Sequence, residues 1–444
     1  MSNQVQSNMQ KVAYTALAGT SIEWYDFFLY GAAAALIFPT VFFGEASPST
    51  ALILSFLTFA AGFIARPIGG IIFGHFGDRI GRKKTLVTAL ILMGVSSTLI
   101  GLLPTYAMIG VTAPILLTTL RFAQGIAIGG QWGGAMLLVT ESAPSNQRGY
   151  YGAFAQAGAP AGVILANLAF IITSASVSDE SFLAWGWRIP FLASALLIAI
   201  SMYIQLNLED TKAFKELQSY KENHLKDNNL NETSLKKSPI IEAIKKYPKR
   251  IILAAGAFLS IQVTFYILIA FMLVYGVSDT NLSRADILTA ILIASAIQIP
   301  VQFVFASYSD RHGRKGIFML GAVLTALWAF AIFPLVDTGS FWLTVLAITG
   351  GLVFLAMMYG PQAAFFTELF TTEVRYSGAT LGYQFGAIAG GAFAPSIAAF
   401  LWTEYDIVWV SAYIAFASLL TLLSVMTLTE TFQTDLNETT SQEI

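Results

Sequence analysis

The hydrophobic positions of the 444-residue chain form long, nearly continuous runs separated by short polar segments. A run of about 20 apolar residues crosses the ~30 Å hydrocarbon core of a bilayer as an α-helix. The runs do not alternate with a period of two, which argues against the strands of a β-barrel. They predict twelve transmembrane helices, over residues 13–38, 50–74, 85–104, 112–141, 150–174, 187–207, 249–275, 285–309, 317–336, 341–369, 377–401 and 407–428.

One long polar segment divides this pattern into two sets of six spans. Residues 208–248 contain Lys-rich and Asn-rich sequence such as KDNNLNETSLKK, which favours a solvated tether over the alternative of a regulatory docking segment. The pattern therefore predicts an all-α integral membrane protein with two parallel six-helix halves. Its parts are a cytoplasmic N-terminal segment (1–12), a first half (13–207), the linker (208–248), a second half (249–428) and a cytoplasmic tail (429–444).

The composition agrees with a membrane protein and excludes several other classes. Hydrophobic residues make up 56% of the chain and charged residues 11%, against about 45–50% and about 25% in soluble domains. A net charge of -2 gives no basic surface for nucleic acid. The chain has no cysteine, and its histidines, His75, His224 and His312, are scattered. We therefore expect no metal, no cofactor other than a proton gradient, and no nucleic-acid partner.

The positions of lysine and arginine predict the orientation in the membrane. On this map, 20 basic residues fall in the segments on one side, and only Arg188 and Arg284 fall on the other. The positive-inside rule places the basic side, and with it both termini, in the cytoplasm. The polar first twelve residues do not resemble a removable signal peptide.

Two charge motifs recur in corresponding places of the two halves. The sequence GHFGDRIGRKK follows the second span and YSDRHGRK follows the eighth, so that Asp78 is matched by Asp310, 232 residues later. The second motif is an acid with an arginine seven residues later, and it recurs after 227 residues: Glu141 with Arg148, and Glu368 with Arg375. A repeat of six spans predicts two halves of the same topology, related by an axis along the membrane normal.

These loops resemble the signature of the major facilitator superfamily. The segments SIEWYDFFLYGAAAALIFP (21–39), FIARPIGGIIFGHFGDRIGRKK (63–84), RFAQGIAIGGQWGGA (121–135), WGWRIPF (185–191) and TEVRYSGATLGYQ (372–384) are similar to its metabolite:proton symporter family, which includes shikimate, α-ketoglutarate, citrate and proline/betaine carriers. The resemblance implies alternating access, with a cytoplasmic latch made by Asp78 with Arg82 and by Asp310 with Arg314. It also implies that Glu141, Arg148, Glu368 and Arg375 join these ion-pair networks. The alternative is that the basic residues are topology signals only.

Four ionisable residues fall inside predicted spans, where a charge costs at least ~2.5–3.5 kcal/mol at the centre. Glu23 and Asp26 are three residues apart and share a helix face with Tyr30. Arg66 and Arg121 are the two bases, and we expect acids and bases to neutralise one another in part. A fixed buried salt-bridge cluster is the alternative to a transport role. Arg121 with Gly125 and Gly129 matches RxxxGxxxG, a superfamily pattern whose arginine is tied to proton coupling.

Polar side chains on several other spans are candidates for lining a wet cavity. The alternative for each is a hydrogen bond between helices. The proposed proton-coupling residues are Asp26 and, second, Glu23. The candidate substrate-binding residues are Arg66, Arg121, Tyr30, Gln131, Trp132, Gln156, Gln262, Tyr266, Tyr359, Gln362 and Tyr383.

One position departs from the resemblance. Where that family usually reads GGEWGGA or GGEYG, this chain has Gln131 in the place of the acid. Glutamine has nearly the shape of a protonated glutamic acid but cannot release a proton. It is either natural divergence or an engineered mimic, and in both cases proton coupling depends on other residues.

These observations predict a proton-coupled importer of a small organic anion in the cytoplasmic (inner) membrane, acting as a monomer in the lipid bilayer. A monocarboxylate, a dicarboxylate and a zwitterion all fit the four buried charges. An exporter of the same fold is the nearest alternative, since GAPAG at 158–162 partly resembles an exporter pattern. A polytopic membrane enzyme is the alternative from another class, but the sequence contains no GxxxxGK[ST], HExxH or GxSxG motif.

Overall fold

The computed structural model of the chain describes residues 3–80, 82–129, 136, 139–140, 143–209, 239–371 and 374–432. Within these ranges, side chains are described except at 3–8, 74–80, 82–86, 204–209, 239–242 and 376. All regular structure in the described part is helical.

The first half is built from six spans and several short helices. Its elements are α1 (Asn3–Leu36), α2 (Phe38–Phe43), α3 (Pro48–Ile80), α4 (Arg82–Leu102), α5 (Tyr106–Ile109), α6 (Thr112–Gly129), η1 (Ser145–Gln147), α8 (Arg148–Ser176), α9 (Asp179–Ser181), η2 (Phe182–Gly186) and α10 (Arg188–Glu209).

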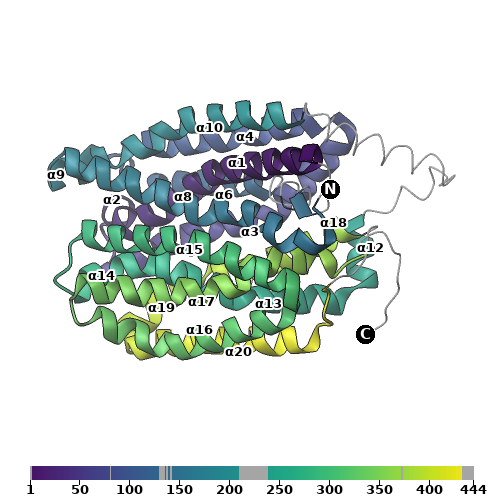
Figure 1. Cartoon of the computed structure of the whole chain (residues 1–444). Helices are drawn as coiled ribbons and strands as arrows, with labels where there is room; N and C mark the ends of the chain where they lie inside the picture. Colours follow the sequence, from purple (N-terminus) through teal and green to yellow (C-terminus); the bar gives the residue numbers. More distant parts are fainter. Residues whose placement is uncertain are drawn as a thin grey trace.

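The second half repeats the arrangement. Its elements are α12 (Pro239–Lys246), α13 (Pro248–Tyr266), η4 (Ile267–Phe271), α14 (Met272–Asp279), α15 (Arg284–His312), α16 (Arg314–Val336), α17 (Phe341–Glu368), α18 (Arg375–Gly386), η5 (Ala387–Ala392), α19 (Ala394–Glu404) and α20 (Ile407–Thr427). In Figure 1 the helices of the first half, purple to teal, lie in one layer, and those of the second half, green to yellow, lie in the other.

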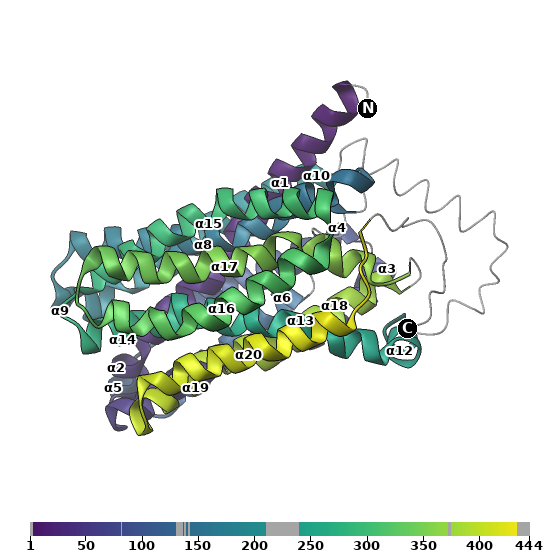
Figure 2. The ribbon, with the colours of Figure 1, turned by 60° about the horizontal axis from the view of Figure 1, so that its bottom comes forward.

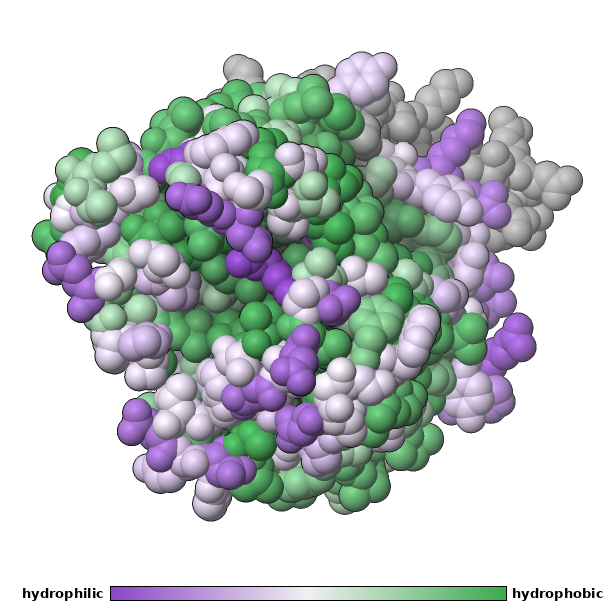
Figure 3. Space-filling model, turned by 90° about the vertical axis from the view of Figure 1, so that its left-hand side faces the viewer, coloured by the Kyte–Doolittle hydropathy of each residue, from purple (hydrophilic) through white to green (hydrophobic). Residues whose placement is uncertain are grey.

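Helices lie in all twelve predicted regions, the fourth being described as a continuous helix only to Gly129. Among the described residues, eight helices are long and apolar enough to cross a membrane, and Asp179–Gly186 with Arg188–Tyr203, bent by 50°, makes a ninth when the pair is taken as one span. Helices α1, α4 and α6 complete the set. Large apolar side chains such as Leu196, Ile252 and Leu327 are 66%, 70% and 68% exposed on the outer surface, as expected of side chains that face lipid. Figure 3, a view onto the end that carries α9, shows hydrophilic residues spread over this end and hydrophobic residues along the flanks.

Two features of the helices were not anticipated by the sequence. Helix α1 begins at Asn3, ten residues before the predicted start, and Figure 2 shows its first turns extending past the neighbouring helices. The seventh and eleventh spans each contain a π-helical segment, η4 and η5. Such segments widen a helix locally and are frequent at functional sites.

The two halves meet mainly along α8, which packs against α15 and α17, and along α3, which packs against α19 and η5. The beginning of α1 and the end of α20 lie at the same end of the bundle, opposite α9 (Figure 1), as an even number of spans requires. We call this the latch end, because it carries the ion pairs described below, and the opposite one the α9 end.

Candidate functional site

Two buried arginines lie among aromatic rings in the first half. Arg66 on α3 is 1% exposed and Arg121 on α6 is 0% exposed. The guanidinium carbon of Arg66 lies 4.3 Å from the ring centre of Phe27 and 4.4 Å from that of Phe63. The guanidinium carbon of Arg121 lies 4.2 Å from the ring centres of both Phe27 and Tyr30. These rings attract the cations through their electron-rich faces.

Neither arginine has an acidic partner among the described side chains, whose ion pairs all involve other residues. The Nε and Nη2 groups of Arg66 and of Arg121 are buried without any hydrogen-bond acceptor. Ring contacts replace only part of the stabilisation that an anion gives to a buried cation. Each guanidinium therefore keeps buried donor nitrogens whose hydrogen bonds are unmade.

Asp26 forms no direct ion pair with these arginines, although it lies close enough to Arg121 for the two charges to interact, in line with the partial neutralisation expected from sequence. Its Oδ2 accepts a hydrogen bond of 2.5 Å from Ser97 Oγ on α4, and its Oδ1 is buried without a partner. The carboxylate therefore lies on the α4 side of α1, while the guanidiniums are enclosed by rings. Ser97 also accepts a bond of 2.6 Å from Gln124 Nε2, and Gln124 Oε1 accepts one of 3.1 Å from Arg121 Nη1. Glu23 is half-buried in the same helix.

Glycines explain how α3 and α6 bring the two arginines so close. A methyl group at Gly125 would collide with the carbonyl oxygen of Gly62, and one at Gly129 would collide with that of Arg66. The glycines of the RxxxGxxxG pattern therefore let the two backbones touch. The arginine of the same pattern is held against the rings of α1 and α3.

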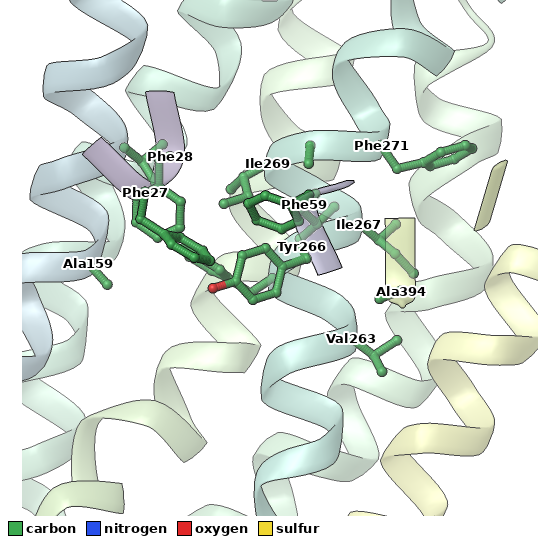
Figure 4. Close-up of a cluster of buried hydrophobic side chains, with 14 of the residues drawn as sticks. Phe27, Phe28, Phe59, Ala159, Val263, Tyr266, Ile267, Ile269, Phe271 and Ala394 are labelled. Atoms are coloured by element: carbon green, nitrogen blue, oxygen red, sulfur yellow. The ribbon is translucent and has the colours of Figure 1, made fainter. Parts of the chain in front are cut away.

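A small cavity lies between the halves next to this cluster, with a volume of about 10 Å³, which is room for about one water molecule. It adjoins the arginine cluster through Trp24, whose ring centre is 5.5 Å from the Arg66 guanidinium, and through Tyr266. Figure 4 shows the Tyr266 ring beside Phe27 and Phe59. The lining residues are Trp24, Phe28 and Ala159 from the first half, and Phe258, Ile261, Gln262, Phe265, Tyr266, Leu355, Tyr359 and Tyr383 from the second.

Four of the predicted substrate-binding residues thus line one cavity: Gln262, Tyr266, Tyr359 and Tyr383. Buried Gln262 Nε2 has no hydrogen-bond partner. Tyr30 is not among the residues that line the cavity. Its hydroxyl donates to Thr58 Oγ1 at 2.7 Å, within the first half.

Gln156 and Gln362 form a contact between the halves rather than part of the cavity lining. Gln156 Nε2 on α8 donates to Gln362 Oε1 on α17 at 2.5 Å, and it also lies 3.5 Å from the carbonyl oxygen of Tyr359. Because Tyr359 lines the cavity, this amide pair closes the space between α8 and α17 next to it.

A network of ion pairs joins the halves at the latch end. Arg314 is 0% exposed, and its Nη1 lies 2.6 Å from Asp310 Oδ1 while its Nη2 lies 3.1 Å from Glu368 Oε1. Arg148 Nη1, at the start of α8, lies 3.7 Å from Glu368 Oε1. The Asp310 carboxylate accepts the backbone N–H groups of Gly149 and Tyr150, both at 2.8 Å. The carboxylate of the second half therefore binds the N-terminus of a first-half helix, where the helix dipole favours an anion.

The residues after α20 cover this network. Glu430 accepts hydrogen bonds from the backbone N–H groups of Arg314 and Lys315, both at 2.9 Å, at the N-terminus of α16. Thr431 Oγ1 donates to Glu368 Oε2 at 2.8 Å. Between α15 and α16, Gly313 has a φ of 98°, a conformation that glycine adopts without strain.

Several predicted residues fall outside this description. Gln131, Trp132 and Glu141 lie outside the described residues, and so do the side chains of Asp78 and Arg82. Arg375 is buried, and its Nε donates to the carbonyl oxygen of Phe370 at 3.3 Å. The gating roles of all eight latch candidates stay predictions.

Sequence reasoning missed the residues that connect the predicted ones. Ser97, Phe27, Phe59 and Thr431 are ordinary residues of apolar spans or of the tail, and only the packing places them at the site. Gly149, by contrast, follows Arg148 of the repeated motif directly. That position could have been recognised as the point where a helix N-terminus meets the opposite loop.

Comparisons with known proteins agree with the fold. A model of the Major Facilitator Superfamily matches residues 16–381 and 279–442. The inner membrane metabolite transport protein YhjE of Escherichia coli K12 is 38% identical over 96% of this chain and 95% of its own length. The shikimate transporter of E. coli K12 is also 38% identical, over 92% of this chain and 91% of its own. The xylose transporter XylE from E. coli, in a partially occluded inward open conformation, superposes with a TM-score of 0.69 at 18% identity, over 96% and 99% of the two chains.

Proposed function

The chain belongs to the Major Facilitator Superfamily and is a transporter rather than an enzyme, and from this we propose that it couples the uptake of a small organic anion to protons. The substrate site alternates between the two sides of the membrane as the halves rock about it. Its relatives are metabolite transporters, one of them named for the inner membrane and one for shikimate.

The main support for this proposal comes from two buried guanidiniums that form no ion pair among the described side chains. Arg66 and Arg121 are buried, lack an acidic partner among the described side chains, and each keep two N–H groups without an acceptor. A substrate carboxylate supplies the missing acceptors, and a guanidinium can bind it through two parallel hydrogen bonds. A carrier of cationic compounds gains nothing from these two charges.

The side chains around the cavity next to the arginines suit the rest of a small substrate, which enters when the halves move apart, because the cavity measures only about 10 Å³ in this conformation. Trp24, Tyr266 and Tyr383 offer ring faces to its apolar body, and Gln262 offers a free amide N–H for one polar group. A zwitterion such as a betaine is the second candidate, because the aromatic lining attracts a quaternary ammonium group while the arginines hold the carboxylate.

In this proposal the proton binds Asp26, with Glu23 as the second candidate. Asp26 is buried with one carboxylate oxygen free, and it is linked to Arg121 through Ser97 and Gln124. Protonation neutralises the Asp26 carboxylate, whose charge is costly to bury. The substrate-loaded carrier can then switch its opening from one side of the membrane to the other.

In this proposal the latch end and both termini face the cytoplasm, because the loops at this end carry most of the lysines and arginines. The pairs of Arg314 with Asp310 and Glu368 then hold the cytoplasmic side closed and must separate before the substrate is released inside. A single chain contains both halves and works as a monomer in the bilayer.

Uptake into proteoliposomes tests the proposal. Labelled shikimate, α-ketoglutarate, citrate, proline and glycine betaine are offered with and without an imposed pH gradient, acid outside. We expect at least one carboxylate to be concentrated only when the gradient is present. The proposal is contradicted if the carrier transports only organic cations, or if the pH gradient changes the uptake of none of these substrates.

A further inference from the structure

The hydrogen bonds between Arg121 and Asp26 have a fixed direction. Arg121 Nη1 can only donate, so the group of Gln124 that faces it at 3.1 Å must be the amide oxygen. The amide nitrogen of Gln124 then faces Ser97 Oγ at 2.6 Å and can only donate to it. Arg121 thus determines which way the Gln124 amide points. The amide in turn leaves the single Ser97 proton for another acceptor.

Ser97 has two acceptors within reach for that proton. One is Asp26 Oδ2 at 2.5 Å and the other is the carbonyl oxygen of Met93, on its own helix, at 3.0 Å. When Asp26 is ionised, the hydroxyl donates to the carboxylate. When Asp26 is protonated, its O–H donates to Ser97 Oγ, and the serine proton turns to Met93. The hydroxyl therefore keeps its bonds satisfied in both states, with no polar group left unpaired at Ser97.

Among the described side chains, the other groups around Asp26 are not linked to Arg121 through Gln124, which bonds Ser97. The titratable and charged side chains that face it are Tyr25, on its own helix, and Arg121 on α6, with Arg66 on α3 beyond Arg121. Tyr25 Oη is engaged with the carbonyl oxygen of Pro190 at 2.8 Å. Helices α4 and α10 contribute the hydroxyls of Ser97 and Ser194, and both face Asp26. The Ser194 hydroxyl also has an alternative acceptor, the carbonyl oxygen of Pro190 at 3.4 Å.

We infer that Ser97 and Gln124 are positioning residues that link the hydrogen bonding of Arg121 to the protonation of Asp26. An anion that binds the free Nε and Nη2 donors of Arg121 and draws the guanidinium away from Gln124 releases the Gln124 amide, which can then turn its oxygen to the Ser97 hydroxyl. Asp26 then loses the Ser97 donor while Ser194 still faces it, and its protonated form is favoured. Anion binding thereby promotes proton binding, and by linkage the proton promotes anion binding, which is the sign that symport requires. This inference rests on the proposed role of Asp26.

Infrared difference spectroscopy during a pH titration of the purified, reconstituted carrier tests the link without any substrate. The C=O band of the protonated acid is assigned to Asp26 by its loss in Asp26→Asn. In Ser97→Ala the ionised form loses a charge-assisted bond and the protonated form a weaker one, so the midpoint of this band moves up by about one pH unit. Gln124→Leu moves it in the same direction by less. Thr98→Ala is the matched control on α4, since Thr98 bonds only the Gly94 carbonyl of its own helix, and it leaves the midpoint in place.

The double variant separates a serial link from two independent contacts. If Gln124 acts on Asp26 only through the Ser97 hydroxyl, then Ser97→Ala with Gln124→Leu shifts the midpoint no further than Ser97→Ala alone. Additive shifts, or an Asp26 band that Ser97→Ala leaves unmoved, overturn the inference while the role of Asp26 stands. If the C=O band of the protonated acid is unchanged in Asp26→Asn, the band does not belong to Asp26, and the proposed role of Asp26 is overturned instead. Ser97→Cys, which keeps a weaker donor, replaces the alanine variant if the latter does not fold, with a smaller shift in the same direction.

Discussion

Two groups of buried arginines are held in opposite ways, one at the latch end and one among the aromatic rings of α1 and α3. Arg314 of the second half and Arg66 and Arg121 of the first are all at most 1% exposed. Arg314 lies within 3.1 Å of two carboxylates and also donates to Ser309 Oγ at 2.7 Å. Arg66 and Arg121 have aromatic rings around them and form no ion pair with an acid among the described side chains.

The difference teaches which charges are structural and which are available. A buried guanidinium whose donors all meet acceptors holds elements together, as Arg314 holds α15, α17 and, through Asp310, the start of α8. A buried guanidinium with free donors is costly to the apo protein. We propose that Arg66 and Arg121 are retained because a bound substrate completes their hydrogen bonds.

The largest effect is expected from breaking the paired arginine. Arg314→Met leaves Asp310 and Glu368 buried without their main cation, which costs the latched arrangement on the order of 3–5 kcal/mol. The latch end should open. A single cysteine at Ala363, which is 0% exposed between α8 and α17, reports this in an otherwise cysteine-free chain. Faster thiol labelling of Ala363→Cys is expected in the Arg314→Met background, and an unchanged rate would show that Arg314 does not hold this end.

Removing either unpaired arginine should act on the substrate instead. Arg66→Ala or Arg121→Ala should weaken binding of the transported anion by roughly 2–5 kcal/mol and leave the labelling of Ala363→Cys slow. Equilibrium binding to the purified carrier measures this, with Arg314→Met as the contrasting variant. Unchanged affinity in both alanine variants would reduce Arg66 and Arg121 to partners of the aromatic rings.

A smaller effect is expected where α8 meets the opposite loop. A methyl group at Gly149 would lie 2.7 Å from the carbonyl oxygen of Ala306 and 2.8 Å from Arg314 Nη1. Gly149→Ala should therefore weaken the latch by about 1–3 kcal/mol, as overpacking does. Gly316→Ala is the control, because nothing lies within 4 Å of its added carbon. Equal labelling rates for Ala363→Cys in the two variants would contradict the tight contact.

The smallest effect concerns the residues after α20. Thr431→Val removes the hydroxyl that bonds Glu368, while Glu368 keeps Arg314, so a loss of about 1 kcal/mol is expected. Thr427→Val removes only a bond to the Leu423 carbonyl of its own helix. A modest increase in Ala363→Cys labelling for Thr431→Val, absent in Thr427→Val, confirms that the tail supports the latch. Identical rates would limit Thr431 to a local role.

The sequence was sufficient for the fold because hydrophobic runs and repeated loops report on spans and symmetry directly. The twelve helices and the family follow from these. The ion-pairing of Asp310 with Arg314 could be anticipated because the motif places them four residues apart across a turn. Contacts between distant spans could not be anticipated. Ser97 lies 71 residues from Asp26, and no local pattern reveals that a serine of an apolar helix, rather than an arginine, binds the buried acid.

The central claim is that the unpaired charges of the first half couple a proton to an anion, and Asp26→Asn tests it most directly. In proteoliposomes that contain this variant, a pH gradient should no longer concentrate the anionic substrate, because no proton binds at residue 26. Exchange of labelled for unlabelled substrate across the membrane without a gradient should continue, since the arginines and the cavity remain. Wild-type levels of gradient-driven accumulation in Asp26→Asn would contradict the account and make Glu23 the next residue to test.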